Sequence, residues 1–183
     1  VVPEDHNNLV ANALGLIGRK ASIRINKKIP PGTGLGGGSS NAAAVLRWGK
    51  YEDLKCAAEI GADVPFCING GRALVSGIGE NVEKMSYKKQ EYTLLIPPFP
   101  CSTKAVYEHW DQLGGPKGDH GNDLEPAATS LYPELNKWRD LLGNTTGQEP
   151  RLAGSGSTWY VEGAFPKRGL HVVSSIPRQK FGD

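Results

Sequence analysis

The fold-determining stretch of the sequence is Pro30-Pro31-Gly32-Thr33-Gly34-Leu35-Gly36-Gly37-Gly38-Ser39-Ser40-Asn41-Ala42-Ala43-Ala44. Five of the seven residues from Gly32 to Gly38 are glycine, a composition that disfavours a helix or a regular strand because glycine loses the most conformational entropy on ordering. Two serines and an alanine run follow, which is typical of a helix with a serine N-cap. Free backbone N–H groups at a helix start bind phosphate. The stretch therefore predicts a phosphate-binding loop that leads into a helix at about Asn41–Trp48.

Three well-known glycine motifs do not fit this loop. The Walker form needs a lysine where Gly38 stands. The spacing of Gly32, Gly34 and Gly37 satisfies G-x-G-x-x-G, but two prolines precede it where a dinucleotide fold needs a tight strand-to-loop junction. The protein-kinase loop continues into a strand, whereas this one continues into Ser-Ser-Asn-Ala-Ala. A flexible linker is disfavoured because linkers do not end in a capped, alanine-rich helix. The remaining interpretation is a phosphate-binding loop that has hydroxyl groups in place of the lysine.

Composition excludes several classes of partner and site. The 183 residues carry 21 Lys and Arg against 19 Asp and Glu, a net charge of +2, which argues against nucleic-acid or anionic-membrane binding. No apolar run is long enough to span a membrane, and the N-terminus does not resemble a signal peptide. The cysteines and histidines lack metal-ligand spacing and no CxxC occurs, so we expect a reducing compartment and neither disulfide nor zinc.

The first half of the chain is expected to hold a loop over 1–6 and further helices and strands. Periodicity predicts helices over 9–17 and 51–60, strands over 21–26 and 72–76, and a buried strand directly after Asp63. The junction from Trp48 to Glu52 has no turn signal, although packed helices need a connection of a few residues. We therefore expect residues to be missing from the sequence at Lys50–Tyr51.

A polar, charged segment around 86–91 predicts a domain boundary, which gives domains 1–89 and 90–183. In the second domain we expect strands over 92–96, 159–161 and 171–173, helices over 104–113 and from Pro133 to Leu142, and a tail from Pro177. A second glycine cluster, Ala153–Thr158, precedes the strand that contains Trp159. Trp48, Trp138 and Trp159 are expected in cores. Because no repeated βαβ run occurs, the predicted class is α+β.

The loop resembles the glycine-rich signature of the GHMP kinases. Gly36–Asn41 is most similar to the branch that phosphorylates 4-diphosphocytidyl-2-C-methyl-D-erythritol, since other branches usually read G-L-G-S-S-A there. Three further stretches support this branch in the right order, namely Gly61–Phe66, Asn122–Glu125 and Gly154–Thr158. The resemblance covers nearly the whole chain. It implies a two-domain α+β fold with an N-terminal S5 domain 2-like nucleotide domain and a C-terminal ferredoxin-like α/β-plait domain.

The resemblance also implies a reaction and a set of site residues. The reaction is transfer of a phosphoryl group from ATP, with Mg²⁺, to the 2-hydroxyl of the small-molecule substrate in non-mevalonate isoprenoid biosynthesis. It implies a monomer or weak homodimer in the bacterial cytoplasm or the plastid stroma of a plant. Asp63 is the implied catalytic base, Thr103 and Gly154 bind substrate, and Ser40 contacts the metal. The implied nucleotide-binding residues are Asn8, Leu9, Lys27, Pro30, Pro31, Gly32, Thr33, Gly34, Leu35, Gly36, Gly37, Gly38, Ser39 and Ser40.

The family carries a catalytic lysine on an N-terminal strand that this sequence does not match, and Val1–Leu9 already resembles a later family stretch. We therefore expect a further segment on the N-terminal side of Val1. Two other functions stay open: another GHMP kinase of homoserine or mevalonate type, and a catalytically silent binding protein of this fold. Simpler structural roles also stay open, as helix caps for Asn8, Ser102 and Thr103, as a turn carboxylate for Asp63, and as a plain turn for Gly154–Ser157.

Overall fold

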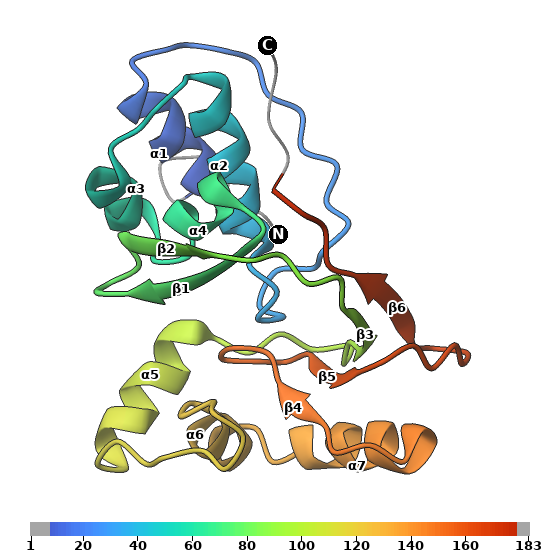
Figure 1. Cartoon of the computed structure of the whole chain (residues 1–183). Coiled ribbons are helices and arrows are strands. Elements are labelled where there is room, and N and C mark those ends of the chain that lie inside the picture. The colour runs from blue at the N-terminus through green and yellow to red at the C-terminus, as the bar shows by residue number, and fades with distance from the viewer. Residues whose placement is uncertain (1–7, 179–183) are drawn as a thin grey trace. The chain divides into compact units, whose positions relative to one another are not determined.

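The structure of the chain, a computed structural model, describes residues 8–178 (Figure 1). The expected loop over 1–6 lies outside the described residues. Contacts divide the chain into two units. Within the described residues, unit 1 contains 8–28, Gly36–Lys89 and 176–178, and unit 2 contains Ile29–Leu35 and Gln90–Ser175. The units, like the expected domains, meet after Lys89. They differ from the expected domains in two segments: Ile29–Leu35 makes its contacts in unit 2, and 176–178 makes its contacts in unit 1.

Unit 1 is a cluster of helices with one hairpin. Its elements are α1 Leu9–Leu16, α2 Gly37–Trp48, α3 Leu54–Ile60, α4 Val64–Asn69, β1 Arg72–Ser76 and β2 Asn81–Met85. The side chain of Asn8 accepts a hydrogen bond from Val10 N at 3.0 Å, which confirms the predicted start of the first helix. The four helices share a core that includes Ala13, Ala42, Leu46 and Val64, all fully buried. The hairpin is antiparallel and pairs Arg72 with Met85.

Two predicted strands of unit 1 are wrong. Residues 21–26 form no strand, because no described strand supplies the hydrogen-bonded neighbour that an extended segment needs. Ile25 packs against the core, but Ile23 is 40% exposed. The segment after Asp63 is the helix α4, with Pro65 in its first turn. Proline is tolerated there because the N–H groups of a first turn have no acceptor within the helix. The strand β2 was not predicted.

The junction between α2 and α3 is closed without an obvious turn signal. Lys50 takes the left-handed conformation (φ 54°), with Lys50 N donating to Arg47 O and Tyr51 N to Leu46 O. These are the two bonds of a Schellman motif, formed here with lysine in place of the usual glycine. Asp53 then caps α3 by accepting from Lys55 N and Cys56 N. The expected loss of residues at Lys50–Tyr51 stays a prediction.

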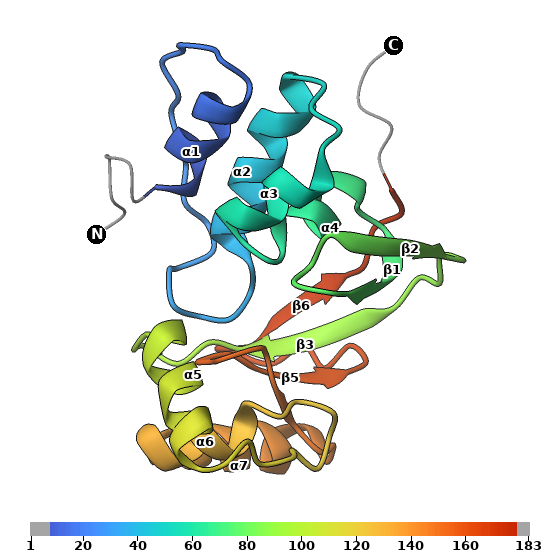
Figure 2. The same cartoon turned by 90° about the vertical axis from the view of Figure 1, so that its left-hand side faces the viewer.

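Unit 2 packs three helices against a sheet (Figure 2). Its elements are β3 Glu91–Leu95, α5 Thr103–Gln112, α6 Glu125–Leu131, α7 Leu135–Thr146, β4 Arg151–Leu152, β5 Trp159–Glu162 and β6 His171–Ser174. The sheet is antiparallel in the order β4-β5-β3-β6, with Leu95 opposite Trp159 and Tyr92 opposite Val173. The helices connect β3 to β4 with β5 between them, which is the split βαβ arrangement of ferredoxin-like sheets. No helix joins β5 to β6 in the described residues.

The core of unit 2 surrounds Trp159, which is fully buried, as predicted, together with Leu135, Leu142 and Val106. Trp138 packs against this core. Trp48 does not belong to a core: it is 53% exposed, and the Arg19 guanidinium lies 4.7 Å from its ring centroid. Residues 8–178 contain no helix with the length and apolarity to cross a membrane.

Candidate active site

The helix α2 begins earlier than the sequence indicates. Its N-cap is Gly36, in the left-handed conformation (φ 62°), and no side chain caps the helix. The predicted serine N-cap is therefore wrong, because Ser39 and Ser40 already lie in the first turn. The first intrahelical bond runs from Ser40 N to Gly36 O at 2.9 Å. The N–H groups of the preceding residues have no acceptor within the helix, and they lie at the positive end of its dipole.

Two side chains from other elements, those of Asp63 and Leu9, lie beside this helix start within unit 1. Asp63 Oδ2 lies 3.9 Å from the point where a Cβ on Gly36 would stand, and Leu9 Cδ1 lies 3.4 Å from the same point on Gly38. Ser39 Oγ lies 3.8 Å from the corresponding point on Gly61. The fold thus brings Leu9, the Gly36–Ser40 turn and Asp63 together, although they are far apart in the sequence.

Asp63 holds the N-cap position of α4, but its side chain caps nothing. It is exposed, and within residues 8–178 no hydrogen bond or ion pair engages its carboxylate. The simpler role as a carboxylate that caps the next segment is therefore wrong. A solvent-facing carboxylate beside an uncapped helix start is able to accept a proton from a hydroxyl group bound there.

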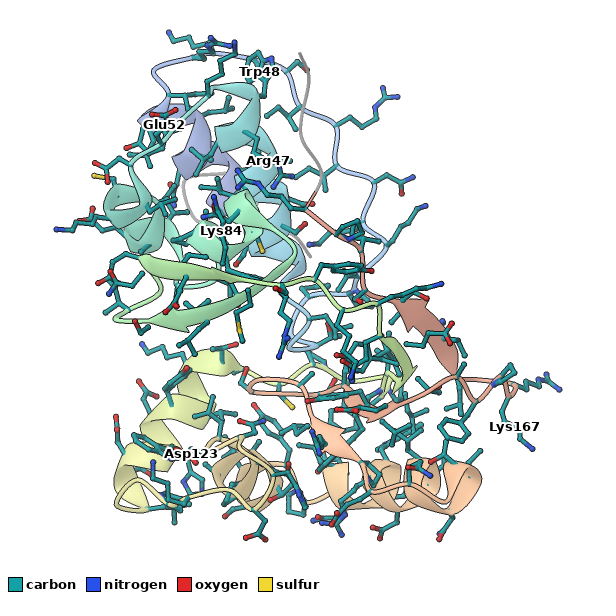
Figure 3. All side chains as sticks on the ribbon, in the orientation of Figure 1. Arg47, Trp48, Glu52, Lys84, Asp123 and Lys167 are labelled. Atoms are coloured by element: carbon teal, nitrogen blue, oxygen red, sulfur yellow. The ribbon has the colours of Figure 1, made fainter. Side chains whose placement is uncertain are left out.

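Arg47, at the other end of α2, was missed by sequence reasoning (Figure 3). Its Nη1 donates to the carbonyl oxygen of Cys67 in α4, so it joins the two helices that carry Gly36 and Asp63. Burial lowers the pKa of Arg47. Burial, with the charge of Asp63 as a smaller cause, raises the pKa of the Cys67 thiol to about 11, against the opposing effect of Arg47. No local pattern marks this bond, because its partners are twenty residues apart.

The first half of the loop is bound within unit 2. Gly32 O accepts from Cys101 N at 2.8 Å and from Ser157 N at 3.2 Å, and Thr33 O accepts from Thr158 N at 3.2 Å. A Cβ on Gly34 would stand 1.8 Å from Ala153 O, so only glycine fits at this contact. The second glycine cluster therefore packs against the loop and is more than a plain turn.

The other predicted site residues have individual places in the structure. Asn8 is a helix N-cap, as the simpler interpretation held, and Lys27 lies in the extended segment over 19–28, with no hydrogen bond or ion pair to a described residue. Ser102 caps α5 by accepting from Ala105 N at 3.3 Å. Thr103 is the first residue of that helix, and its hydroxyl bonds the hydroxyl of Ser155 at 2.9 Å. Other loop residues are anchored or exposed: Thr33 Oγ1 donates to Pro30 O, and Pro31 is exposed.

Known proteins of similar sequence identify the family of the chain. The pattern of the GHMP kinases N terminal domain matches residues 7–71. The 4-diphosphocytidyl-2-C-methyl-D-erythritol kinase of Carboxydothermus hydrogenoformans is 37% identical over 88% of this chain and 67% of its own length. The enzyme of that name from Pseudomonas fluorescens is 35% identical over 91% of this chain and 66% of its own.

This chain belongs to the 4-diphosphocytidyl-2-C-methyl-D-erythritol kinase family. A crystal structure of 4-(cytidine 5'-diphospho)-2C-methyl-D-erythritol kinase matches the fold with a TM-score of 0.67 at 28% identity, over 87% of this chain and 70% of that one. The chain spans about two thirds of the length of its curated relatives in this kinase family. The first alignment runs over 194 positions, more than the whole 183-residue chain, so that relative carries residues within the matched region that this chain lacks.

Proposed function

We propose that this protein transfers the γ-phosphoryl group of ATP to the 2-hydroxyl of 4-diphosphocytidyl-2-C-methyl-D-erythritol, a step of non-mevalonate isoprenoid biosynthesis. The names of its relatives support the reaction. The observation that carries the proposal within this chain is the exposed carboxylate of Asp63 beside the uncapped start of α2. A helix start suited to phosphate and a carboxylate suited to act as a base therefore lie next to each other in unit 1.

The Gly36–Ser40 turn is proposed to bind the phosphates of ATP. The N–H groups of Gly37, Gly38 and Ser39 lack intrahelical acceptors and point out of the positive end of α2. Glycine at positions 37 and 38 lets phosphate oxygens approach the backbone closely. Gly32–Leu35 continues the same loop, and Asn8, Leu9 and Lys27 are proposed to lie toward the adenine.

Asp63 is proposed to orient the acceptor hydroxyl and to accept its proton during transfer. A tertiary alcohol is a hindered and weakly acidic nucleophile, so both a positioned base and neutralisation of phosphate charge are needed. The lysine that the resemblance implies has no counterpart in the 183 residues. The proposed chemistry of these residues therefore rests on Asp63 and the loop alone. Thr103 and Gly154 are proposed as substrate-binding residues.

Mg²⁺ fits the donor set at the helix start. Within residues 8–178 no group of three or more His, Cys, Asp or Glu side chains is arranged to hold a metal. Magnesium at kinase sites is held mainly by phosphates and water with few protein ligands, so the proposal does not require such a group. The exposed hydroxyl of Ser40, in the first turn of α2, is the residue proposed to contact it. Bound there, the ion would neutralise charge on the phosphates.

A substrate panel tests the proposal and separates it from the two alternatives. The intact protein is incubated with ATP, Mg²⁺ and, in parallel, 4-diphosphocytidyl-2-C-methyl-D-erythritol, homoserine and mevalonate, and products are measured by mass spectrometry. We expect a phosphorylated product from the first compound alone. Turnover of homoserine or mevalonate instead would reassign the enzyme within the GHMP kinases. Binding of ATP without turnover of any compound would support a silent binding protein.

A further inference from the structure

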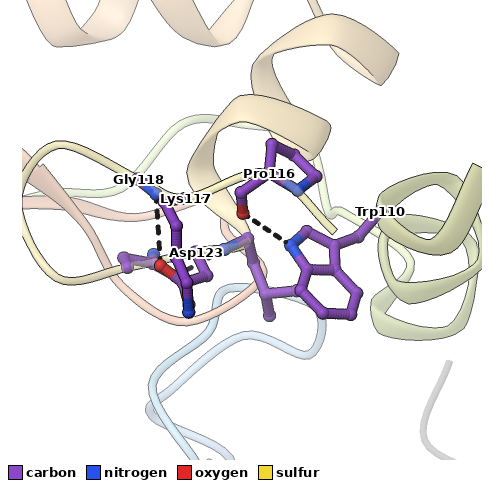
Figure 4. A network of polar contacts seen from close by, with 7 residues as sticks. Trp110, Pro116, Lys117, Gly118 and Asp123 are labelled. Carbon is purple, nitrogen blue, oxygen red and sulfur yellow. Dashed lines mark hydrogen bonds and ion pairs between the residues drawn. The ribbon is translucent and has the colours of Figure 1, made fainter. Parts of the chain in front are cut away.

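Asn122 lies at the end of a loop between α5 and α6 that is closed by its own contacts (Figure 4). Asp123 receives hydrogen bonds from Lys117 Nζ at 2.8 Å and from Gly118 N at 3.2 Å. Trp110 Nε1 donates to Pro116 O at 2.9 Å. The Lys117 ammonium and the Gly118 N–H hold the pKa of the Asp123 carboxyl below its ordinary value, so it stays ionised near neutral pH. The loop therefore presents Asn122 from a fixed position.

Both the nitrogen and the oxygen of the Asn122 side-chain amide are hydrogen-bonded. Its Nδ2 donates to Leu152 O at 2.9 Å and to Gly154 O at 2.8 Å, and its Oδ1 accepts from Leu124 N at 3.1 Å. Two donors and one acceptor in this arrangement require an amide. A carboxylate of the same size would place negative charge against two carbonyl oxygens and would remove the hydrogen bond that Asn122 donates to each.

The carbonyl groups that Asn122 holds belong to the segment that binds the phosphate loop. Gly154 follows Ala153, whose carbonyl oxygen lies against the backbone of Gly34. The same segment closes on itself through Ala153 N to Thr158 O at 2.9 Å, and it donates from Ser157 N and Thr158 N to the loop. A shift of this turn would therefore move Gly32–Gly34.

We propose that Asn122 is a positioning residue for the nucleotide, acting through the Leu152–Thr158 turn on the Gly32–Leu35 half of the phosphate loop. The inference deepens the proposed function and rests on it, since it gives a role to the Asn122–Asp123 motif that the reaction itself leaves without one. Asn122 itself touches neither phosphate nor substrate. It fixes the turn, and the turn fixes Gly32–Gly34 within unit 2.

The test compares Asn122→Ala with Asn136→Ala in the intact protein. Asn136 also donates from Nδ2 to a backbone carbonyl, that of Pro133 at 3.1 Å, but has no link to the loop. We expect Asn122→Ala to weaken ADP binding about tenfold by calorimetry, because two hydrogen bonds that hold the turn are lost. Amide exchange at residues 32–35 should become faster in the same variant. Asn136→Ala should change neither measurement, whatever it does to the melting temperature.

A double-mutant cycle shows whether the effect passes through the turn. In Gly34→Ala the loop is already displaced from Ala153, so adding Asn122→Ala should cost much less ADP affinity than it does alone. Full additivity would overturn the inference, and so would an Asn122→Ala variant with unchanged ADP affinity and exchange. The wild-type measurements separate the two proposals. If the protein binds ADP and phosphorylates the substrate while Asn122→Ala behaves like wild type, only the positioning role is lost. If wild type binds no nucleotide, both proposals fail.

Discussion

The carboxylate of Asp63 faces Gly36, with Oδ2 at 3.9 Å from the point where a Cβ on that glycine would stand. Gly36 is the N-cap of α2 and Asp63 the N-cap of α4, and neither helix has a side-chain cap. Side-chain caps usually stabilise helices by about 1 kcal/mol. Their absence at two adjacent helix starts leaves the N–H groups and the carboxylate free for ligands, which is what a phosphoryl-transfer site needs.

Gly34→Ala should weaken nucleotide binding more than its backbone conformation explains. Gly34 has φ 73° and a Cβ there would stand 1.8 Å from Ala153 O, whereas Gly114 has φ 77° and open space around it. Both substitutions carry the cost of a left-handed alanine, about 1 kcal/mol, but only Gly34→Ala must displace the loop. We expect a loss of ADP affinity of about tenfold or more for Gly34→Ala. Equal affinities in the Gly34→Ala and Gly114→Ala proteins would show that the contact with Ala153 does not matter.

Glu125→Gln should raise the melting temperature at neutral pH. Burial raises the pKa of Glu125, although the Leu152 N–H and the charges of His120 and Arg139 lower it in part, and Asp119 raises it further. The folded state therefore disfavours the ionised form, so this carboxylate reduces stability as pH rises through its folded pKa. Below its ordinary pKa, roughly 4.3, both states are protonated and the cost disappears. Thermal melts of both proteins between about pH 3.5 and about pH 8 provide the check. A stabilising effect that grows toward acid would contradict the sign.

Cys101 should react slowly with iodoacetamide in the folded protein. Burial, with the charge of Glu134 as a smaller cause, raises the pKa of this thiol to about 11, and the side chain is 2% exposed. At pH 8 roughly one thiol in a thousand is then ionised. Labelling in urea should be faster by about two orders of magnitude or more, because an unfolded thiol has an ordinary pKa and open access. Comparable rates at Cys101 in both conditions, measured by peptide mass spectrometry, would mean that this thiol is not buried in the core of unit 2.

The sequence predicted what local chemistry determines. Asn8 as a cap, the helix predicted over 9–17 and the strand around Trp159 follow from residues close to one another in the chain. The Ala21–Asn26 alternation failed because strand formation depends on a partner elsewhere. The pattern after Asp63 predicted a buried strand, although Pro65 stands in the first turn of a helix.

In the candidate site too, local motifs could be predicted from the sequence, whereas contacts between distant residues could not. Asp63 and the Gly36–Ser40 turn were identified from motifs, but their proximity was not, because it depends on how α2 and α4 pack. Arg47 and Asn122 were missed as contributors since their bonds reach backbone carbonyls 20 and about 30 residues away. Side-chain bonds to distant backbone leave no periodic signal in the sequence.

The most direct test of the proposed mechanism is the rate of phosphoryl transfer by Asp63→Asn in the intact protein, with 4-diphosphocytidyl-2-C-methyl-D-erythritol and ATP measured in a single turnover. We predict a rate lower by at least about 10²-fold, equivalent to roughly 3 kcal/mol of barrier, with ADP affinity within about threefold of wild type. The amide preserves the shape of the side chain but cannot accept the proton. A transfer rate within about twofold of wild type would remove Asp63 from the role of base and contradict the mechanism.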